Sequence, residues 1–528
     1  MTSIRIFYSL LVCVIISGFA AQRVYREIVW RIQPEKTSLR LQYAGGHAAL
    51  VHSEEEHDRL HRIEDVVLLP DNQALLLMRL RFMLPPKSSL SCVFSNKIAT
   101  PAMGVDYRED RAALIRCEIP PHFSVSPNSV DIITALTEPT NAIMSLQKTG
   151  SRPVKWNHMV YESAVTEMDV ILLAKGINAR QGINAAPQAL RCVFSNTVET
   201  AVTISAQEIF RCAHPPQHLQ SQLSGGKITL KTLPSQIMPS AAYYNPQYII
   251  SEAKDIPKKL LCACTMVFNI AKFLEEWIIY HSHLGVEEFF IYDNNSEDNL
   301  EEVITKSVQS GYNVSRRVWP WAKTQEAGFA HCSLTAANKC KWVMFTDVDE
   351  FVFSHGWLHD PAASSNALKT MILNKTSTEQ GNRVGQVSMK CRNFGASNLK
   401  EHPVAGVTQG YTCREREMRR HKSILLLEAA SLSLMNAVHH FELKPGYKTV
   451  GVKSSEAVIN HYKYQAWSEF REKFRRRASA YVVDWKQGSN RASQDRAPGV
   501  GFEAVRPLDW EKKFCQVNDT SLRQFTAK

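Results

Sequence analysis

The segment that decides the fold is WVMFTDVDEF, residues Trp342–Phe351. Its first half is an apolar run of the kind that forms a buried parallel strand. The run ends in an Asp-x-Asp triplet, and the period of two in an extended segment puts Asp347 and Asp349 on the same side. Carboxylates at the carboxyl end of a core strand lie where open α/β sheets bind ligands, and hard divalent cations prefer oxygen ligands. The triplet therefore predicts a metal site at a sheet edge; the alternative is a strand end with solvent-facing acidic residues.

The chain before this triplet alternates between strand-like and helical patterns. The expected order is a strand at 260–268, a helix at 269–284, a strand at 286–292, a helix at 300–310, a strand at 314–318 and a helix at 325–341. Gly285 is placed to end the first helix. Strands that alternate with helices in this way predict an α/β domain with a mostly parallel sheet. Further on, we expect a strand at 384–389 and an amphipathic helix at 465–483.

Two further residues in this half are candidates for binding a nucleotide. Asp293 follows the second strand, where an acidic residue can hydrogen-bond a ribose or a base. As a plain turn, the sequence Asp-Asn-Asn-Ser is unremarkable. Lys422 lies in the basic run 414–423 and can neutralise a diphosphate as a point charge. The alternative for the run is a solvated basic face.

The N-terminal half has an all-β pattern, with short apolar runs between Pro, Gly and Asn turns over residues 62–235. It contains an internal repeat, because CVFSN occurs at 92–96 and again at 192–196, and each copy is followed by a cysteine shortly before Pro-Pro. The repeat predicts the disulfides Cys92–Cys117 and Cys192–Cys212 in a β-sandwich-type accessory domain. Such a domain either binds carbohydrate, with Trp156 or Tyr161 as a stacking surface, or serves as a spacer. Cys391 and Cys413 bracket a later loop and are a further candidate pair.

The composition and the N-terminus bear on the cellular compartment. Residues Ile6–Ala21 are apolar, which fits an uncleaved membrane anchor or a cleaved signal peptide. Both interpretations place the remainder in the secretory lumen, and twelve cysteines agree with an oxidising compartment. The net charge of +11 is spread along the chain, and no nucleic-acid-binding signature is present, so we expect no nucleic-acid partner. The candidate glycosylation sites are Asn313, Asn374 and Asn518.

These patterns divide the chain into seven parts. They are a cytoplasmic tail at 1–5, a transmembrane anchor at 6–22, a stem at 23–61, the accessory domain at 62–235, a linker at 236–257, the α/β domain at 258–500 and a tail at 501–528.

The α/β half resembles glycosyltransferase family 92, and is closest to its plant members, which include pectic β-1,4-galactan synthases. The resemblance spans about residues 255–500 and rests on four groups of residues, which are EEWI with His281, the strand end at 291–296, Gln325 with His331-Cys332, and FTDVDEF. Plant galactan synthases also carry an N-terminal β-rich carbohydrate-binding module, and the cysteine-repeat region is similar in position and type.

The resemblance implies a GT-A fold, a UDP-sugar donor, a divalent metal that is typically Mn²⁺, and inversion at the anomeric carbon. It places Asp347 and Asp349 on the metal, Asp347, Asp293 and Lys422 on the donor, and a C-terminal histidine in the remaining metal position, for which His461 is the first candidate and His439 the second. The family pattern has a basic residue before Lys-Ser, whereas this chain has His421.

The expected activity is transfer of a sugar, by resemblance galactose, to a cell-wall polysaccharide or glycan acceptor in the Golgi or another secretory membrane. An acceptor hydroxyl must lose its proton in such a transfer. Glu415 is the first candidate for the base, and Glu417 and Glu442 are alternatives in the same part of the chain. A homodimer is left open. The competing interpretations are a non-catalytic luminal glycan-binding protein on a GT-A scaffold and a metal-dependent hydrolase.

Overall fold

The structure is a computed structural model, and it describes most of the chain from residue 61 onward. The described residues are 61–70, 72–79, 84, 90–108, 112–123, 132–137, 143–147, 152–178, 183–250, 257–377, 383–437, 439–473, 499–500 and 503–527. The expected cytoplasmic tail, anchor and most of the stem lie outside the described residues. None of the helices in the described part is long and apolar enough to cross a membrane. Residues 60–528 form one compact unit.

The first sheet contains the first copy of the repeat. Its strands are β1 (His61–Leu69), β2 (Gln73–Arg79), β3 (Ser91–Phe94), β4 (Ala99–Tyr107), β5 (Ala112–Glu118), β6 (Ile133–Thr137), β7 (Ile143–Gln147) and β8 (Val154–Lys155). They pair in the order β2-β5-β4-β3-β6-β7-β1-β8, and β1 also pairs with β2. Because β1 pairs with β2 along 62–69 and with β7 along 61–63, seven strands form a closed circuit. A closed circuit is typical of a barrel and differs from the two facing sheets expected of a sandwich.

The second sheet contains the second copy of the repeat. Its strands are β9 (Met159–Thr166), β10 (Val170–Lys175), β11 (Leu190–Phe194), β12 (Val198–Ala206), β13 (Ile209–Cys212), β14 (Ile228–Thr232), β15 (Gln236–Ile237) and β16 (Ile249–Ile250), and α3 (Gln217–Leu223) follows β13. The order is β15-β14-β11-β12-β13-β10-β9-β16. In each copy of the repeat, a disulfide joins the two strands that flank a middle strand. These bonds are Cys92–Cys117, across β4, and Cys192–Cys212, across β12, so both predicted pairs are present.

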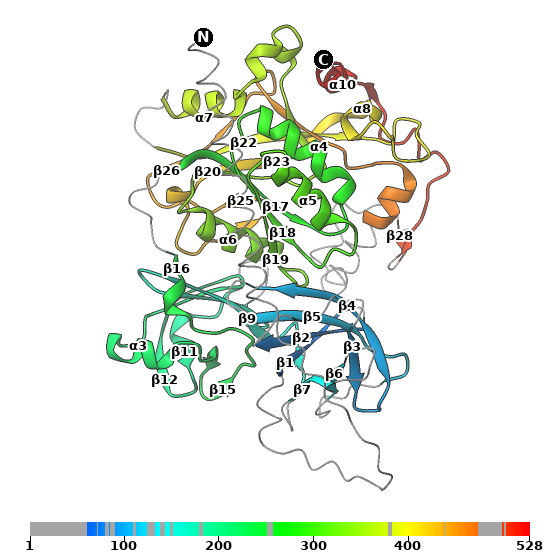
Figure 1. Cartoon of the computed structure of the whole chain (residues 1–528). Helices are drawn as coiled ribbons and strands as arrows, with labels where there is room; N and C mark the ends of the chain where they lie inside the picture. The colour runs from blue at the N-terminus through cyan, green and yellow to red at the C-terminus, as the bar shows by residue number, and fades with distance from the viewer. Residues whose placement is uncertain are drawn as a thin grey trace, which may run out of the picture. The chain divides into compact units, whose positions relative to one another are not determined.

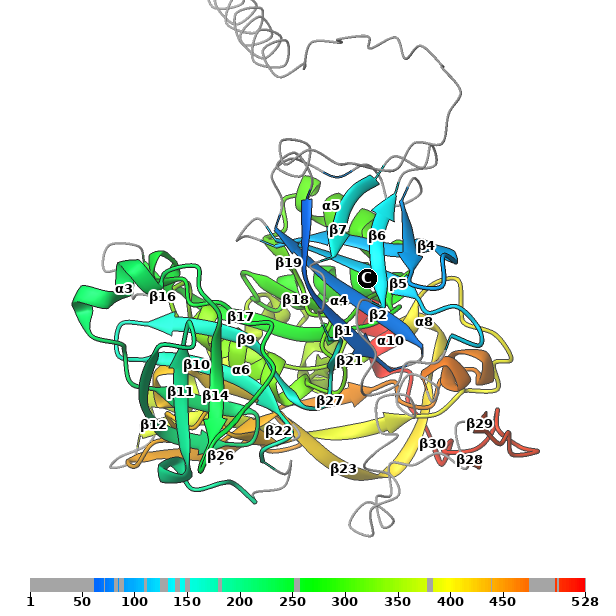
Figure 2. The ribbon, with the colours of Figure 1, turned by 90° about the horizontal axis from the view of Figure 1, so that it is seen from below.

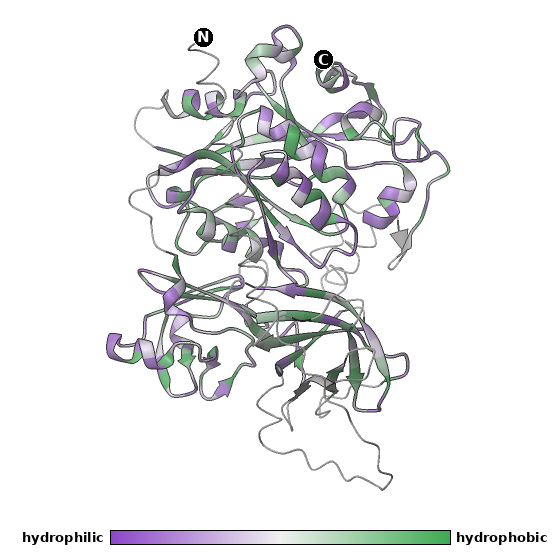
Figure 3. Cartoon of the chain, viewed as in Figure 1, coloured by the Kyte–Doolittle hydropathy of each residue, from purple (hydrophilic) through white to green (hydrophobic). Residues whose placement is uncertain are grey.

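The third sheet begins with the predicted alternation of strands and helices. The elements are β17 (Lys259–Val267), α4 (Ala271–His283), β18 (Phe289–Asp293), α5 (Leu300–Gln309), β19 (Val314–Val318), α6 (Gln325–Ala336) and β20 (Cys340–Phe345). The four strands are parallel, in the order β19-β18-β17-β20. The predicted order of elements is correct. Their boundaries agree to within three residues, except that α6 ends at Ala336 and not at the expected residue 341. Figure 1 shows α4 and α5 close together in front of these strands, and the hydropathy colouring of Figure 3 shows that both helices carry hydrophobic and hydrophilic turns.

The remainder of the third sheet is mixed, because β23 pairs antiparallel with β20 and β22. Its other strands are β21 (Glu350–Phe353), β22 (Arg383–Phe394), β23 (Cys413–Leu426), β26 (Tyr447–Gly451), β27 (Val458–His461) and β30 (Val517–Asn518). The other elements in the described part are α7 (Ala367–Ser377), α8 (Val407–Gly410), α10 (Ser521–Thr526), β24 (Asn436–Ala437), β25 (His440–Phe441), β28 (Gly499–Val500) and β29 (Glu503–Ala504), together with 3₁₀ turns at Pro187–Ala189, Pro246–Tyr248, His355–Leu358, Pro361–Ser364 and Leu427–Ala429. The expected helix at 465–483 is helical over 467–473, and its remainder lies outside the described residues. Figure 2 shows the long strand β23, in yellow, which pairs with β20 and β22.

The central strands have an apolar core on each face. On β17, Leu261 and Ala263 belong to a core with α4 and α5, whereas Cys262 and Cys264 belong to a core with α6. The second core extends into the N-terminal sheets, which contribute Val67, Leu75, Leu77, Leu114, Met159 and Tyr161, among others. Tyr161 is buried, so its ring is part of this core and not the exposed stacking surface that the sequence suggested. The N-terminal sheets and the third sheet therefore share one hydrophobic core.

The remaining cysteines correct one sequence prediction. Three further disulfides are Cys262–Cys340, Cys264–Cys332 and Cys413–Cys515. The predicted pair Cys391–Cys413 is wrong, since Cys391 is a free, buried thiol in the core of β22. The C-terminal β30 pairs with the start of β23, and that pairing brings the tail, with Cys515, beside Cys413.

Candidate active site

Three loops at the carboxyl ends of β17, β18 and β19 are connected by side-chain hydrogen bonds. Asn269, after β17, accepts from the Glu297 amide at 2.7 Å and its own amide donates to the Ser296 hydroxyl at 3.0 Å. Asn294, after β18, donates through Nδ2 to the carbonyls of Trp319 and Trp321, after β19. The loops therefore form one connected edge, as expected for the ligand-binding side of a parallel sheet.

The predicted nucleoside-binding residue, Asp293, is the last residue of β18, and its side chain is 1% exposed. Its Oδ1 accepts a hydrogen bond from the Ser296 amide at 2.8 Å, and its Oδ2 accepts from Arg316 Nε at 2.9 Å and Nη2 at 2.6 Å. Both carboxylate oxygens thus have protein partners, and Asp293 holds the loop 294–298 in shape.

The Asp-x-Asp triplet lies in a tight turn and not on an extended strand. β20 ends at Phe345 and β21 begins at Glu350, and the Glu350 amide donates to the Asp347 carbonyl at 3.1 Å. The triplet therefore lacks the extended backbone that the period-two argument assumed. The two carboxylates are nevertheless close enough for the charge of Asp349 to oppose the lowering of the pKa of Asp347. The turn brings the carboxylate of Glu350 back to the Asp347 amide, at 3.0 Å.

Asp347 is bound by a buried lysine. Lys422 Nζ donates to Asp347 Oδ2 at 2.9 Å and to His439 Nε2 at 2.7 Å, and it lies 2.9 Å from Glu350 Oε1. Burial opposes ionisation of Asp347, but the Lys422 ammonium outweighs it and holds the pKa of this carboxyl well below its usual range. Burial lowers the pKa of His439 to about 3, and Lys422 adds to the effect, so the His439 ring is neutral and its Nε2 accepts a hydrogen bond from the Lys422 ammonium.

Glu350 is fully buried beside these groups. Burial raises its pKa to about 8; Lys422 opposes this rise, and the neighbouring Asp347 and Asp349 add to it. A cation bound beside Glu350, in addition to Lys422, would favour the ionised form of its carboxylate.

Asp349, Glu350 and His461 form a potential metal centre. One ligand atom from each lies within 4.8 Å of the other two. The geometry follows from the pairing of β21 with β27, which puts His461 directly opposite Glu350. His461 Nε2 is 3.5 Å from Asp349 Oδ2, and its Nδ1 is 3.6 Å from Glu350 Oε1.

These three residues fit a divalent cation. His461 Nε2 is buried and makes no hydrogen bond, and burial lowers the pKa of this ring to about 4, so the nitrogen is neutral and available as a ligand. Two carboxylates and one imidazole suit Mn²⁺ and related ions. Lys473, in the helical segment 467–473, forms an ion pair with Asp349. The structure thus brings together two of the three predicted metal ligands, Asp349 and His461, and adds Glu350, while Asp347 pairs with Lys422.

The candidate base, Glu415, is on β23 close to this centre. It is mostly buried and accepts a hydrogen bond from Asn393 Nδ2 at 2.8 Å. Asn393 in turn is the β22 partner of His461 in the strand register. The alternatives, Glu417 and Glu442, are exposed and bind Arg419 and Ser433.

The three candidate glycosylation sites are at the surface. Asn313, Asn374 and Asn518 are exposed, on the loop before β19, on α7 and on β30.

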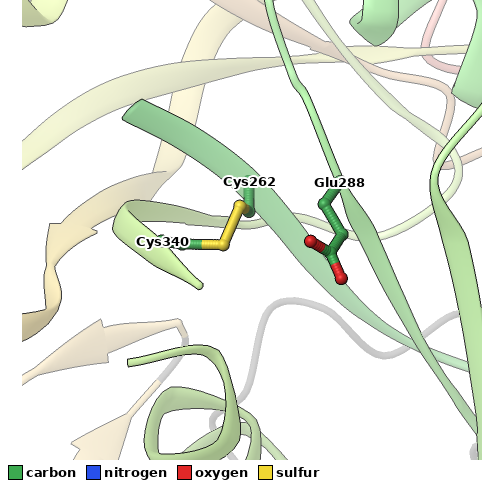
Figure 4. Close-up of side chains that lie close together, drawn as sticks. All are labelled: Cys262, Glu288 and Cys340. Atoms are coloured by element: carbon green, nitrogen blue, oxygen red, sulfur yellow. A yellow bond between two sulfur atoms is a disulfide. The ribbon is translucent and has the colours of Figure 1, made fainter. Parts of the chain in front are cut away.

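A second group of potential ligands, Cys262, Cys340 and Glu288, does not form a metal centre. Figure 4 shows the two sulfur atoms joined in a disulfide beside Glu288. The Glu288 carboxylate binds Lys259 at 2.7 Å and Lys339 at 3.0 Å, so its charge is already compensated.

Sequence comparison connects this site with a known family. A protein of Arabidopsis thaliana described as glycosyltransferase family 92 is 40% identical over 479 residues, which cover 87% of this chain and 81% of that protein. The chain belongs to glycosyltransferase family 92. The family model matches residues 258–493, the part that contains all strands of the third sheet except β30, and the candidate metal centre. Family 92 proteins of Ricinus communis and Oryza sativa subsp. japonica are 36% and 37% identical, with 88% of this chain covered in each case. The protein is accordingly a glycosyltransferase.

Two solved structures show weaker likeness to this family 92 chain. A Pyrobaculum calidifontis mannosyltransferase in complex with GDP-Man and Mn²⁺ has a TM-score of 0.25 and 12% identity, covering 43% of this chain and 63% of its own. Glucosyl-3-phosphoglycerate synthase of Mycobacterium tuberculosis, in complex with Mn²⁺, UDP and glucosyl-3-phosphoglycerate, has a TM-score of 0.21 and 14% identity, covering 42% and 79%. With scores this low, the assignment to the family rests on the sequence relatives.

Proposed function

We propose that this family 92 protein is a metal-dependent, inverting glycosyltransferase of GT-A type that moves a sugar from a UDP-sugar to a polysaccharide or glycan acceptor. Galactose and a cell-wall acceptor are the first candidates, from the resemblance to plant galactan synthases. The observation that carries the metal dependence is the group Asp349, Glu350 and His461, with its buried imidazole nitrogen that makes no hydrogen bond.

The roles of the chain's residues follow from their contacts. Asp349, Glu350 and His461 would hold the cation, which supplies positive charge for a departing diphosphate. Lys422 keeps Asp347 ionised, and it presents a positive charge at the same edge. The connected loops after β17, β18 and β19 provide the surface for the nucleoside.

The transfer itself is a single displacement. The acceptor oxygen forms a bond to the anomeric carbon while the bond from that carbon to the UDP oxygen breaks, and UDP leaves with the electron pair. The acceptor hydroxyl's proton moves to Glu415, whose carboxylate lies beside the candidate metal centre with one partner, Asn393. One in-line displacement inverts the anomeric configuration.

We place the reaction in the secretory lumen, in the Golgi or another secretory membrane. The support is the set of five disulfides among the described residues, because disulfides form and persist in oxidising compartments. The membrane anchor at 6–22 is part of this proposal and lies outside the described residues.

The test is transfer by the purified full-length chain with a panel of UDP-sugars, Mn²⁺ and labelled oligosaccharide acceptors. We expect turnover with UDP-galactose, loss of turnover in EDTA, and a product of inverted configuration by NMR. Asp349→Asn should lower kcat/KM at least 1,000-fold, and the matched control Asp360→Asn, which changes an exposed carboxylate, should leave it unchanged. Glycan binding without turnover of any UDP-sugar would instead identify a non-catalytic binding protein. Undiminished transfer by Asp349→Asn in EDTA would reject the metal.

A further inference from the structure

The first N-terminal sheet presents one of its faces to the third sheet, which carries the candidate active site and is called the catalytic sheet from here on. On β2 and β5, residues alternate between two cores, so that Leu76 and Ile115 lie in the sheet's own core while Leu77 and Leu114 lie in the core shared with the catalytic sheet. Asp106 on β4 is directly opposite Leu114, and residues directly opposite in an antiparallel pair point to the same face. Asp106 therefore faces the catalytic sheet.

Asp106 shares a guanidinium with the aspartate at the end of β18. Arg316 Nη2 is 2.9 Å from Asp106 Oδ1 and 2.6 Å from Asp293 Oδ2. The side chains of Asp106 and Arg316 are 15% and 22% exposed, and that of Asp293 is 1% exposed, so solvent screens this chain of charges weakly. Burial raises the pKa of Asp106, which Arg316 opposes, and both contacts favour the ionised form of the arginine.

A second contact from the same face reaches the same loop. Arg116 on β5 is buried, and its Nη1 is 3.1 Å from Glu297 Oε1, in the loop after Asp293. Arg116 is directly opposite Gly104 on β4, and a Cβ at residue 104 would lie only 3.2 Å from Arg116 Nη2. The glycine thus leaves room for the guanidinium to reach the loop.

The loop that these two contacts hold is the one connected to its neighbours on both sides. Ser296 and Glu297 bond to Asn269 after β17, and Asn294 bonds to the carbonyls after β19. A displacement of residues 293–297 would therefore be transmitted to all three loops at this edge.

We infer that Asp106 is a positioning residue for the donor nucleotide: through Arg316 it fixes Asp293 and the loop 294–297, so that the N-terminal sheet completes the nucleotide site of the catalytic sheet. The inference rests on the proposed function, in which the loop after β18 contacts the nucleoside. It assigns the N-terminal region a role in donor binding, separate from any binding of carbohydrate.

The test compares Asp106→Asn with Asp65→Asn in the full-length chain. Asp65 is a matched control, because it is also a largely buried carboxylate of the first sheet whose pKa burial raises, but its partner is Lys227, directly before β14. We expect Asp106→Asn to raise the donor KM and the Kd for UDP, measured calorimetrically with Mn²⁺, about 5- to 20-fold, with kcat and acceptor KM within twofold. Asp65→Asn should leave these values within twofold. Hydrogen exchange of the amides of 294–297 should accelerate in Asp106→Asn only.

A double substitution separates positioning from general destabilisation. Because Asp106 acts through Arg316, Asp106→Asn should add no further increase in the Kd for UDP to a chain that already carries Arg316→Met. The inference is overturned if Asp106→Asn leaves the Kd for UDP and the exchange of 294–297 unchanged, or if Asp65→Asn raises that Kd as much as Asp106→Asn does. It is also overturned if the increases in Kd caused by Asp106→Asn and Arg316→Met multiply in the double variant. If the wild-type chain binds UDP and Asp106→Asn changes neither the Kd for UDP nor the exchange of 294–297, this inference alone is rejected. A wild-type chain that binds none of UDP, GDP or ADP rejects the proposed function and this inference together.

Discussion

Replacing Lys422 with methionine would test the electrostatic balance of the candidate active site. Methionine keeps much of the apolar chain of lysine and removes the ammonium. Lys422 is 2.9 Å from Asp347 Oδ2, and at this distance with an effective dielectric constant of about 20 the attraction is roughly 6 kcal/mol before desolvation. Desolvation of the ammonium offsets part of it. Removal of one partner from a buried pair typically costs about 3–5 kcal/mol, and we expect that loss in the free energy of unfolding.

The same variant should respond more strongly to metal than the wild type. A ligand at 100 times its Kd stabilises a protein by about 2.7 kcal/mol when it binds only the native state. Lys422 binds Asp347, next to the candidate centre, and lies 2.9 Å from Glu350, which belongs to the centre, so in Lys422→Met a bound cation also relieves the repulsion between carboxylates. We expect the stabilisation by Mn²⁺ to be larger in Lys422→Met than in the wild type.

The assay is urea unfolding followed by tryptophan fluorescence at pH 7, with EDTA or with saturating Mn²⁺. The matched control is Lys390→Met, an exposed lysine on the neighbouring β22, which should change the free energy of unfolding by less than about 0.5 kcal/mol. The reasoning is refuted if Lys422→Met in EDTA is as stable as the control. Equal stabilisation of the variant and the wild type by Mn²⁺ would show that Lys422 and the metal do not interact.

Three further predictions concern the parts that support the site. Burial lowers the pKa of His281 to about 3, so on acidification this histidine is protonated first in the unfolded state, and stability is lost as the pH falls from 6.5 toward 3. In His281→Gln, the slope of the free energy of unfolding against pH should be shallower in this window. Replacing both Cys192 and Cys212 with serine opens a loop of 20 residues, and chain entropy predicts a loss of about 3 kcal/mol in chemical unfolding, whereas no loss would contradict that account. Trp321→Phe removes the indole donor to Glu162 at 3.0 Å, which should cost about 1–3 kcal/mol by the same measurement, and an unchanged stability would mean that water replaces the donor.

The sequence predicted the regular elements of the catalytic sheet well and the turns between them poorly. The strands and helices from 259 to 345 follow from hydrophobic periodicity, which the core on each face of the sheet requires. The position of Glu350 could not be predicted in this way, because the backbone turns between Asp347 and Glu350 and hydrophobic periodicity does not describe a turn. The signal in the sequence is its identity as an acidic residue directly after the triplet.

Contacts between distant segments set the limit of the sequence analysis. His461 was predicted as a metal ligand only by resemblance, since its approach to Glu350 depends on the pairing of β21 with β27, more than 100 residues apart in the chain. Cys413 was assigned to the wrong partner for the same reason, because the partner, Cys515, arrives with a C-terminal strand that no local pattern indicates. Lys473 and Arg316 gave no signal beyond their charge.

The core shared by the N-terminal sheets and the catalytic sheet has a practical consequence for making this enzyme. A fragment that started at Lys258 would expose to water the apolar side chains of Phe290, Tyr292 and Trp319, which now contact the same core as Leu77 and Leu114. Such a fragment is expected to aggregate when it is expressed alone. For the same reason, residues on the two sides of this contact should change together among homologues. Chimaeras that join halves from different species should be soluble only when both sides of the contact come from one parent.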